Sequence, residues 1–160
     1  MSGVSPWALA DHDFLRGLPS DTVTRLAALA AEISFPAGHR LFEEGGMAGQ
    51  FWLIRTGRVA LDLKVPGPAP LIVETIGDGD VIGLSWLAQR RRWQFGAEAV
   101  YPTTAFEFDS AAVSELMDRD SALGYQLARR LIDVATRRLQ ATRFRLLDMY
   151  GLPRPHADAI

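Results

Sequence analysis

The stretch FWLIRTGRVALDLKV at residues 51–65 predicts a β-rich fold. From residue 58 onward apolar side chains alternate with polar or small ones, which is typical of a strand with one face on a core and the other in solvent. The apolar positions are Val59, Leu61, Leu63 and Val65. Thr56-Gly57 interrupts the run, and a glycine that can adopt positive φ favours a tight hairpin turn there. We therefore expect two paired strands, 51–55 and 58–65.

Short runs of the same kind continue on both sides of this stretch. We expect further strands at 40–42, 71–76, 97–101 and 104–108, each bounded by glycine, proline or other turn residues. Many short strands at close spacing indicate a β-sandwich or a jelly-roll barrel. The sequence has no internal repeat, and the proline-rich loop 66–70 is its one strongly biased segment.

Helical periodicity flanks the β region. Before it, a helix capped by Ser20 or Asp21 and ended by the segment 35–38 is predicted from apolar residues at helical spacing. These residues are Val23, Leu26, Leu29, Ala30 and Ile33. After the β region we expect a short helix, capped by Asp109 or Ser110, to about Met117. A long helix over 122–150, stopped by Gly151 and Pro153, should follow it.

The long helix carries two separate apolar faces. One face repeats every seven residues, as the seam of a coiled coil does. Its members are Tyr125, Ala128, Ile132, Ala135, Leu139, Thr142, Leu146 and Met149. The other face, with Leu127, Leu131 and Val134, remains to pack on the β-domain. Two apolar faces on one helix predict a homodimer through the seam; the alternative is a helix that lies on its own barrel without a partner.

Composition and charge describe one ordinary globular domain. The chain has 160 residues, of which 48% are hydrophobic, and a net charge of −2. The absence of cysteine excludes disulfides, thiolate metal sites and a cysteine nucleophile. The first residues lack a basic segment followed by an apolar core, and no run is long enough to cross a bilayer. We therefore expect a cytoplasmic protein with no membrane partner.

A cluster of arginines lies on the predicted long helix. Six of them accompany one acidic residue, Asp133, over the same stretch: Arg129, Arg130, Arg137, Arg138, Arg143 and Arg145. Such a stripe can attract an anionic partner, but a basic helix alone is a weak signal for nucleic acid. We favour a solvated, arginine-rich helix face.

The sequence gives little support for catalysis. Its histidines are His12, His39 and His156, and none is paired at the spacing of metal ligands. The segment Gly83-Leu84-Ser85-Trp86-Leu87 lacks the second glycine of a nucleophile elbow. Glu43-Glu44 has no acid–base partner and is interpreted as solvated charge. We predict a protein that is not an enzyme and holds no metal.

Taken together, the order of elements resembles the effector domain of catabolite-activator/FNR-type regulators, which have a cyclic-nucleotide-binding domain. The resemblance is carried by FPAGHRLFEEG at 35–45, FWLIRTGRVAL at 51–61 and GDVIGL at 79–84. Glycines fall at matching turns in the same order: Gly45, Gly57, Gly79 and Gly83. The resemblance implies a mainly β fold with flanking helices, a double-stranded β-helix (jelly roll) followed by a long C-terminal helix.

The resemblance also implies domain bounds. One cyclic-nucleotide-binding-like domain is expected over 14–150, with its β-roll at 33–109 and the long helix at 122–150. Regulators of this family carry a helix-turn-helix domain after that helix, which needs some tens of residues. Only the tail 151–160 follows here. We therefore expect no helix-turn-helix domain and no direct sequence-specific DNA binding by this chain.

The expected ligand site lies in GDGDVIGLSWLAQRRRWQFGAEA at 77–99. In nucleotide-binding members, a glycine is followed by an acid that accepts from the ribose hydroxyl, and after a loop by an arginine that pairs with the cyclic phosphate and a small hydroxyl residue. Gly83 matches the glycine, but Leu84 stands at the acidic place, and Trp93 and Gln94 at the loop end. A buried phosphate is costly unless a cation and donors replace its water.

These replacements predict a sensor module with a degenerate phosphate-binding cassette and no resident cofactor. Its candidate ligand-binding residues are Gly83, Leu84, Ser85, Arg92, Trp93, Gln94 and Phe95. The effector would be a small molecule other than cAMP, such as an apolar, aromatic or flat ligand, or a partner protein. The alternative is a functional cAMP or cGMP receptor in signal transduction or transcriptional regulation, because an alignment shift of one residue brings Arg92 to the phosphate. Trp86 is interpreted as core, and Trp93 as core or as a cation–π partner of an arginine.

Overall fold

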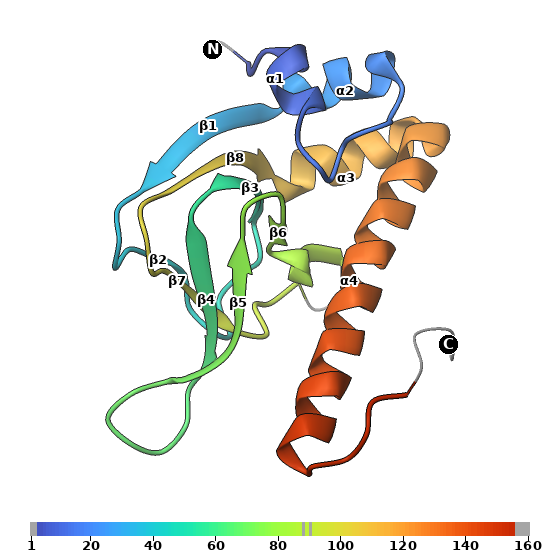
Figure 1. The fold of residues 1–160 in the computed structure, drawn as a ribbon. Helices are drawn as coiled ribbons and strands as arrows, with labels where there is room; N and C mark the ends of the chain where they lie inside the picture. The colour runs from blue at the N-terminus through green and yellow to red at the C-terminus, as the bar shows by residue number, and fades with distance from the viewer. Residues whose placement is uncertain (1–2, 88, 90, 156–160) are drawn as a thin grey trace.

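The computed structural model describes residues 3–87, 89 and 91–155. Two four-stranded antiparallel sheets form a β-roll, and the helices lie outside it (Figure 1). One sheet has the strand order β1-β8-β3-β6 and the other β2-β7-β4-β5. The strands are β1 (Ala30–Phe35), β2 (Arg40–Phe42), β3 (Gln50–Thr56), β4 (Arg58–Leu63), β5 (Leu71–Gly77), β6 (Val81–Ile82), β7 (Gly96–Ala99) and β8 (Thr103–Asp109).

The helices cover one end and one side of the roll. Two short helices, α1 (Pro6–Ala10) and α2 (Ser20–Ala27), precede the first strand, and a 3₁₀ helix η1 (Leu84–Leu87) follows β6. After β8 come α3 (Ser110–Arg119) and α4 (Ser121–Met149), and α4 runs along the roll (Figure 1). This is the predicted arrangement of a mainly β domain with a long C-terminal helix. None of the helices in the described segments is long and apolar enough to span a bilayer.

The prediction for the first helix is wrong beyond Ala27. Residues 30–35 form β1, which pairs along its whole length with β8 from Ala30↔Phe108 to Phe35↔Thr103. The apolar residues have helical spacing, but the segment forms a strand because its backbone pairs with β8. This pairing also buries Ala30 and Phe35 in the core. The predicted cap is also wrong: α2 begins at Ser20 after Pro19, without a side-chain cap.

The predicted hairpin at Thr56-Gly57 is a corner between sheets. β3 pairs with β6 and β8, whereas β4 pairs with β5 and β7. Gly57 has φ +125°, its N–H donates to Asp78 Oδ1 at 2.8 Å, and a Cβ on it would lie 2.3 Å from Thr103 Oγ1. Glycine is therefore required both for the backbone angle and for the close approach of β8. The chain passes from one sheet to the other here, as a jelly roll requires.

The face of β4 that its alternation predicts to be exposed to solvent is partly buried. Ala60 and Asp62 are buried along with Val59 and Leu61. Asp62 is 4% exposed and forms a two-bond ion pair with Arg40, through Arg40 Nη1 to Oδ2 at 2.5 Å and Nη2 to Oδ1 at 3.2 Å. A carboxylate can occupy this face because the guanidinium replaces its water.

The predicted extent of the long helix, 122–150, is confirmed to within one residue at each end, because α4 runs from Ser121 to Met149. The Asp120 side chain accepts from the Leu123 N–H at 3.1 Å, while Asp109 caps α3 through the Ala112 N–H at 2.9 Å. The face predicted to pack on the β-domain is buried, with Leu127, Leu131 and Val134 each at most 3% exposed. The predicted seam lies outside the core: Tyr125, Ile132, Leu139, Leu146 and Met149 are between 52% and 82% exposed.

Candidate ligand-binding site

A cavity of about 350 Å³ lies between the β-roll and α4. That volume is within the roughly 300–1,000 Å³ range of small-molecule sites. Six of the seven residues predicted from the sequence line it together: Gly83, Leu84, Ser85, Trp93, Gln94 and Phe95. The other walls come from β2, β4, β5 and α4. The structure therefore gathers the two halves of the 83–95 segment around one space closed by the long helix.

Gly83 forms a tight turn at the base of this cavity. It follows β6 with φ +94°, a backbone conformation that favours glycine. A Cβ at this position would lie 3.1 Å from the Gln50 carbonyl oxygen and 3.1 Å from two ring atoms of Trp93. The missing side chain thus lets the indole of Trp93 lie against the turn.

The indole of Trp93 is fixed by stacking and by its backbone. It is 5% exposed and stacks on Phe42, with ring centroids 3.9 Å apart and planes 14° from parallel. The Gly45 N–H donates to the Trp93 carbonyl at 2.9 Å, and the Trp93 N–H donates to the Gly46 carbonyl at 2.9 Å. Trp93 was interpreted as a core residue or as a cation–π partner of an arginine. The structure shows a core residue whose indole stacks on an aromatic ring. Trp86, interpreted as core, is also buried and stacks on Phe51.

Arg92 is not among the residues that line the cavity. Its side chain is exposed, and Nη1 donates to the Gly45 carbonyl at 3.0 Å. The residue also forms an isolated β-bridge with Met47. This backbone arrangement holds Arg92 on the surface side of the loop while its neighbour Trp93 turns inward.

A different arginine, Arg138 of α4, does line the cavity. Its side chain is 17% exposed, and Nη2 donates to Asp80 Oδ1 at 3.0 Å and to the Val81 carbonyl. Its Nε is buried without a hydrogen-bond partner among the described residues. The interpretation of the whole arginine cluster as a solvated face is therefore wrong for Arg138. A signal was present, because Arg138 lies four residues after Val134 and continues the buried stripe of α4.

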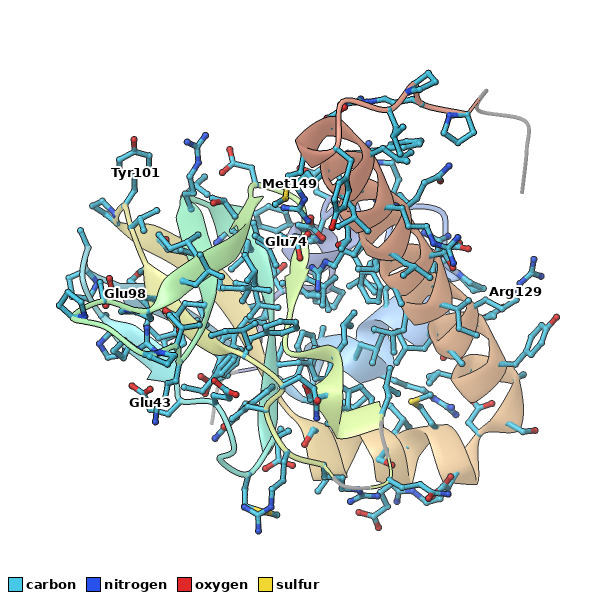
Figure 2. The ribbon with its side chains drawn as sticks, turned by 90° about the horizontal axis from the view of Figure 1, so that it is seen from below. Glu43, Glu74, Glu98, Tyr101, Arg129 and Met149 are labelled. Atoms are coloured by element: carbon cyan, nitrogen blue, oxygen red, sulfur yellow. The ribbon has the colours of Figure 1, made fainter. Side chains whose placement is uncertain are left out.

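Glu74 of β5 brings a carboxylate to the same cavity. It is partly buried, and its side chain lies toward the space between the roll and α4 (Figure 2). Arg129, in contrast, points away from the roll (Figure 2). The cavity thus has mostly apolar and aromatic walls, with a cation on its helical side and a carboxylate on its strand side.

The cavity and the predicted dimer seam share residues. Ala135, Leu139 and Thr142 belong to the heptad pattern and also line the cavity. The other seam residues lie outside it: Tyr125, Ala128, Ile132, Leu146 and Met149. Part of the helix surface expected to contact a second chain is therefore also a wall of the candidate ligand site.

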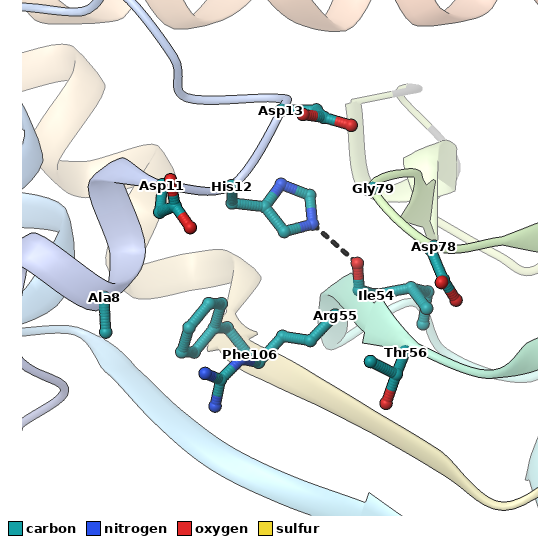
Figure 3. Close-up of a pocket in the computed structure, with 10 residues that line it drawn as sticks. All are labelled: Ala8, Asp11, His12, Asp13, Ile54, Arg55, Thr56, Asp78, Gly79 and Phe106. Atoms are coloured by element: carbon teal, nitrogen blue, oxygen red, sulfur yellow. Dashed lines mark hydrogen bonds between the residues drawn. The ribbon is translucent and has the colours of Figure 1, made fainter.

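A second cavity, of about 270 Å³, lies between the α1 end of the molecule and β3 (Figure 3). His12 is 7% exposed there and bonds through Nε2 to the Ile54 carbonyl at 2.7 Å. Its Nδ1 accepts from the Phe14 N–H at 3.2 Å, so Nε2 must carry the proton of the neutral ring. The residues that the structure describes contain no group of His, Cys, Asp or Glu suited to a metal ion. We interpret this site as a structural joint.

The buried, neutral His12 predicts that the free energy of unfolding depends on pH. Burial lowers the pKa of His12 below its ordinary value of 6.5, despite the Ile54 bond and the charges of Asp13 and Asp80, which raise it. The unfolded state therefore binds more protons below that value, so stability is full above it and falls with pH below it. Between about pH 7.5 and 5.5, urea unfolding should show a larger loss of stability for the wild type than for His12→Gln. Equal pH dependence of stability in the wild type and His12→Gln would contradict the expectation.

Comparison with known proteins identifies a family. The family described as "Cyclic nucleotide-binding domain" matches residues 32–120. A "CRP-like cAMP-activated global transcriptional regulator" of Mycobacterium tuberculosis is 25% identical over 146 residues, which covers 88% of this chain and 61% of the relative. The chain therefore spans less than two thirds of the curated relatives that it matches.

Solved structures share the fold at lower identity. A cyclic nucleotide-binding domain from Methylobacillus flagellatus superposes with a TM-score of 0.80 at 20% identity, covering 99% of this chain and 90% of that one. The regulatory subunit of a cAMP-independent protein kinase A from Trypanosoma brucei gives a TM-score of 0.64 at 18% identity, with coverages of 82% and 44%. The jelly-roll fold expected from the sequence is therefore confirmed.

Proposed function

Because the chain belongs to the cyclic nucleotide-binding domain family, we propose that it is a regulatory sensor module that responds to a ligand other than cAMP. The ligand would occupy the cavity between the β-roll and α4. The observation that carries the proposal is the position of Trp93, whose indole lies against Gly83 and stacks on Phe42. In nucleotide-binding members of the family that this chain resembles, the arginine that pairs with the cyclic phosphate lies at this end of the loop, where this chain has Trp93.

The charge pattern near Gly83 supports the same proposal. Leu84 stands where an acid would accept from the ribose, and it lines the cavity. Arg92 bonds to the Gly45 carbonyl on the exposed side of the loop. A cyclic phosphate beside the indole would lose water without gaining the usual cation, which is unfavourable. The T. brucei subunit, described as cAMP-independent, is consistent with a change of ligand within this fold.

In this proposal the response is transmitted by α4. A ligand in the cavity would contact the helix through Ala135, Arg138 and Leu139. It can shift the packing of α4 only by the difference in its affinity for two arrangements of the helix. The predicted homodimer seam lies on the same helix and would carry the change to a second chain. The proposed module acts by regulation rather than by catalysis.

A cyclic-nucleotide receptor is a second candidate, favoured by Arg138 and Glu74 in the cavity. A guanidinium could bind the cyclic phosphate and a carboxylate could accept from the ribose, although both come from other elements than in the family pattern. The relation to a regulator described as cAMP-activated also fits this candidate.

Calorimetry with cAMP and with cGMP distinguishes the two candidates. We expect no binding tighter than about 10 μM, that is, near −7 kcal/mol, to the wild-type protein. Tighter binding that Arg138→Ala abolishes and Arg137→Ala preserves would establish the cyclic-nucleotide receptor and overturn our proposal. Arg137 is a suitable control because it is the exposed neighbour of Arg138 on the same helix.

A further inference from the structure

We propose that residues 151–155, the strap, compete with self-association of the protein. The strap folds back along α4 on the side away from the roll (Figure 1) and covers one flank of the predicted dimer seam. A second α4 that approaches the seam would therefore meet the strap and would have to displace it. The inference rests on the seam of the proposed function and adds an autoinhibitory contact to it.

The end of α4 fixes the reversal of the chain. Gly151 has φ +66°, and its N–H donates to the Asp148 carbonyl at 3.2 Å. The Leu152 N–H donates to the Leu147 carbonyl at 2.9 Å, which completes the two bonds of a Schellman motif. The motif satisfies carbonyls that a helix end would otherwise leave free, and it directs the following residues back toward the helix.

Side-chain contacts then hold the strap against α4. Arg154 Nε donates to Asp148 Oδ1 at 3.2 Å, and Nη2 donates to Oδ2 at 2.5 Å. The Arg154 guanidinium also lies 5.3 Å from the ring centroid of Phe144. The two members of the ion pair are 57% and 49% exposed, so water weakens their attraction. Such a contact is weak enough to open when a second chain competes for the same surface.

The strap and the seam share a groove. The groove has a volume of about 330 Å³, and Pro155 of the strap lines it together with Leu139 and Leu146 of the seam. The two leucines are 52% and 53% exposed, so the strap leaves much of their apolar surface in water. A second helix could bury that surface more fully, which gives it an advantage over the strap.

The strap covers the flank of the seam that the roll leaves open. Arg138 and Arg145, each directly before a seam leucine, donate to backbone carbonyls of the roll. Thr136 and Arg143, each directly after a seam residue, line the groove with Pro155 instead. Paired helices of a coiled coil also contact each other through the residues that flank the seam. The strap thus occupies space that a partner helix needs.

Replacing Gly151 with valine tests the reversal. A Cβ on Gly151 would meet nothing within 4 Å, so the variant introduces no clash, but a β-branched residue disfavours the left-handed backbone. The strap should open, and the dissociation constant of the dimer should fall about three- to tenfold in sedimentation equilibrium. Gly67→Val is the matched control. It places similar strain in the exposed loop 66–70, where a Cβ also meets nothing within 4 Å, and should leave the constant unchanged.

A charge exchange tests the ion pair independently. Arg154→Asp places two carboxylates together and should tighten the dimer about two- to fivefold. Asp148→Arg combined with Arg154→Asp restores a pair of opposite charges and should return the dissociation constant to within about twofold of the wild-type value. Asp148 is not a member of the seam, so the exchange leaves the seam residues intact. Circular dichroism should report a folded β-roll for every variant.

The outcomes separate the strap from the seam. If the wild type, Gly151→Val and Arg154→Asp dimerise with the same dissociation constant, the strap does not compete and the inference is overturned, while the seam stands. Weaker dimers in Gly151→Val would make the strap part of the interface, which also overturns it. A double variant as tight as Arg154→Asp alone would contradict the role of the ion pair. If neither the wild type nor Gly151→Val associates, the seam of the proposed function fails together with the strap.

Discussion

Replacing Arg40 with methionine should lower the free energy of unfolding by about 3 kcal/mol, because it leaves the buried Asp62 carboxylate without its cation. The Asp62 side chain is only 6% exposed and accepts both bonds from Arg40. Arg40 also pairs with Glu43 at 3.0 Å, but that carboxylate is 55% exposed and keeps its water. Urea unfolding monitored by circular dichroism measures the loss.

A matched variant controls for the loss of an arginine. Arg16→Met removes a pair with Asp13 in which both side chains are more than 60% exposed, so it should cost less than about 1 kcal/mol. In the Asp62→Leu background, Arg40→Met should cost far less than in the wild type, because the buried charge is gone. Equal losses for Arg40→Met and Arg16→Met would show that Asp62 does not depend on its partner.

Replacing Leu146 with aspartate should convert a dimer into monomers. Leu146 belongs to the predicted heptad seam, is 53% exposed and lies outside the cavity between the roll and α4. In a dimer the new carboxylate would be buried against its counterpart on the second chain, which strongly disfavours association. Sedimentation velocity should show the wild type as a dimer and the variant at half its mass. Leu139→Asp should act in the same direction, but it also alters the cavity.

The control for the seam introduces the same residue on another face. Ala141 is exposed on α4 and does not belong to the heptad pattern, so Ala141→Asp should leave the dimer unchanged. Circular dichroism should report a folded β-roll for all variants, since the replaced side chains lie outside the core. Dimers that persist in both Leu146→Asp and Leu139→Asp would remove the coiled-coil argument.

The fold could be predicted from the sequence where one local pattern dominated. The alternation at 58–65 and the long periodic run of α4 predicted a strand and a helix that are both present, although the strand ends at Leu63, and Leu127, Leu131 and Val134 are buried as expected. The helix prediction was wrong for residues 28–33. Their apolar spacing fits a helix as well as a strand, and the pairing with β8 favours the strand. The two-residue β6 is too short to leave a periodic signal.

The candidate site was only partly predictable, for a similar reason. Residues 83–85 and 93–95 could be grouped because the resemblance covers their segment. Arg138 was missed, because it reaches the cavity from a helix more than forty residues later, and charge pattern alone assigned it to solvent. Its position four residues after Val134, on the face predicted to pack on the roll, was the signal that the charge pattern outweighed. The Asp62 and Arg40 pair was missed in the same way, because it joins separate strands of one sheet.

The position of Leu139 has a thermodynamic consequence for the proposed sensor. The same side chain lines the cavity and belongs to the proposed seam. Occupancy of the cavity and self-association would then be linked equilibria, and each must alter the other by the same factor. The effector concentration that half-saturates this protein would accordingly depend on how much of the protein is present. A cell could retune such a sensor by changing its abundance alone.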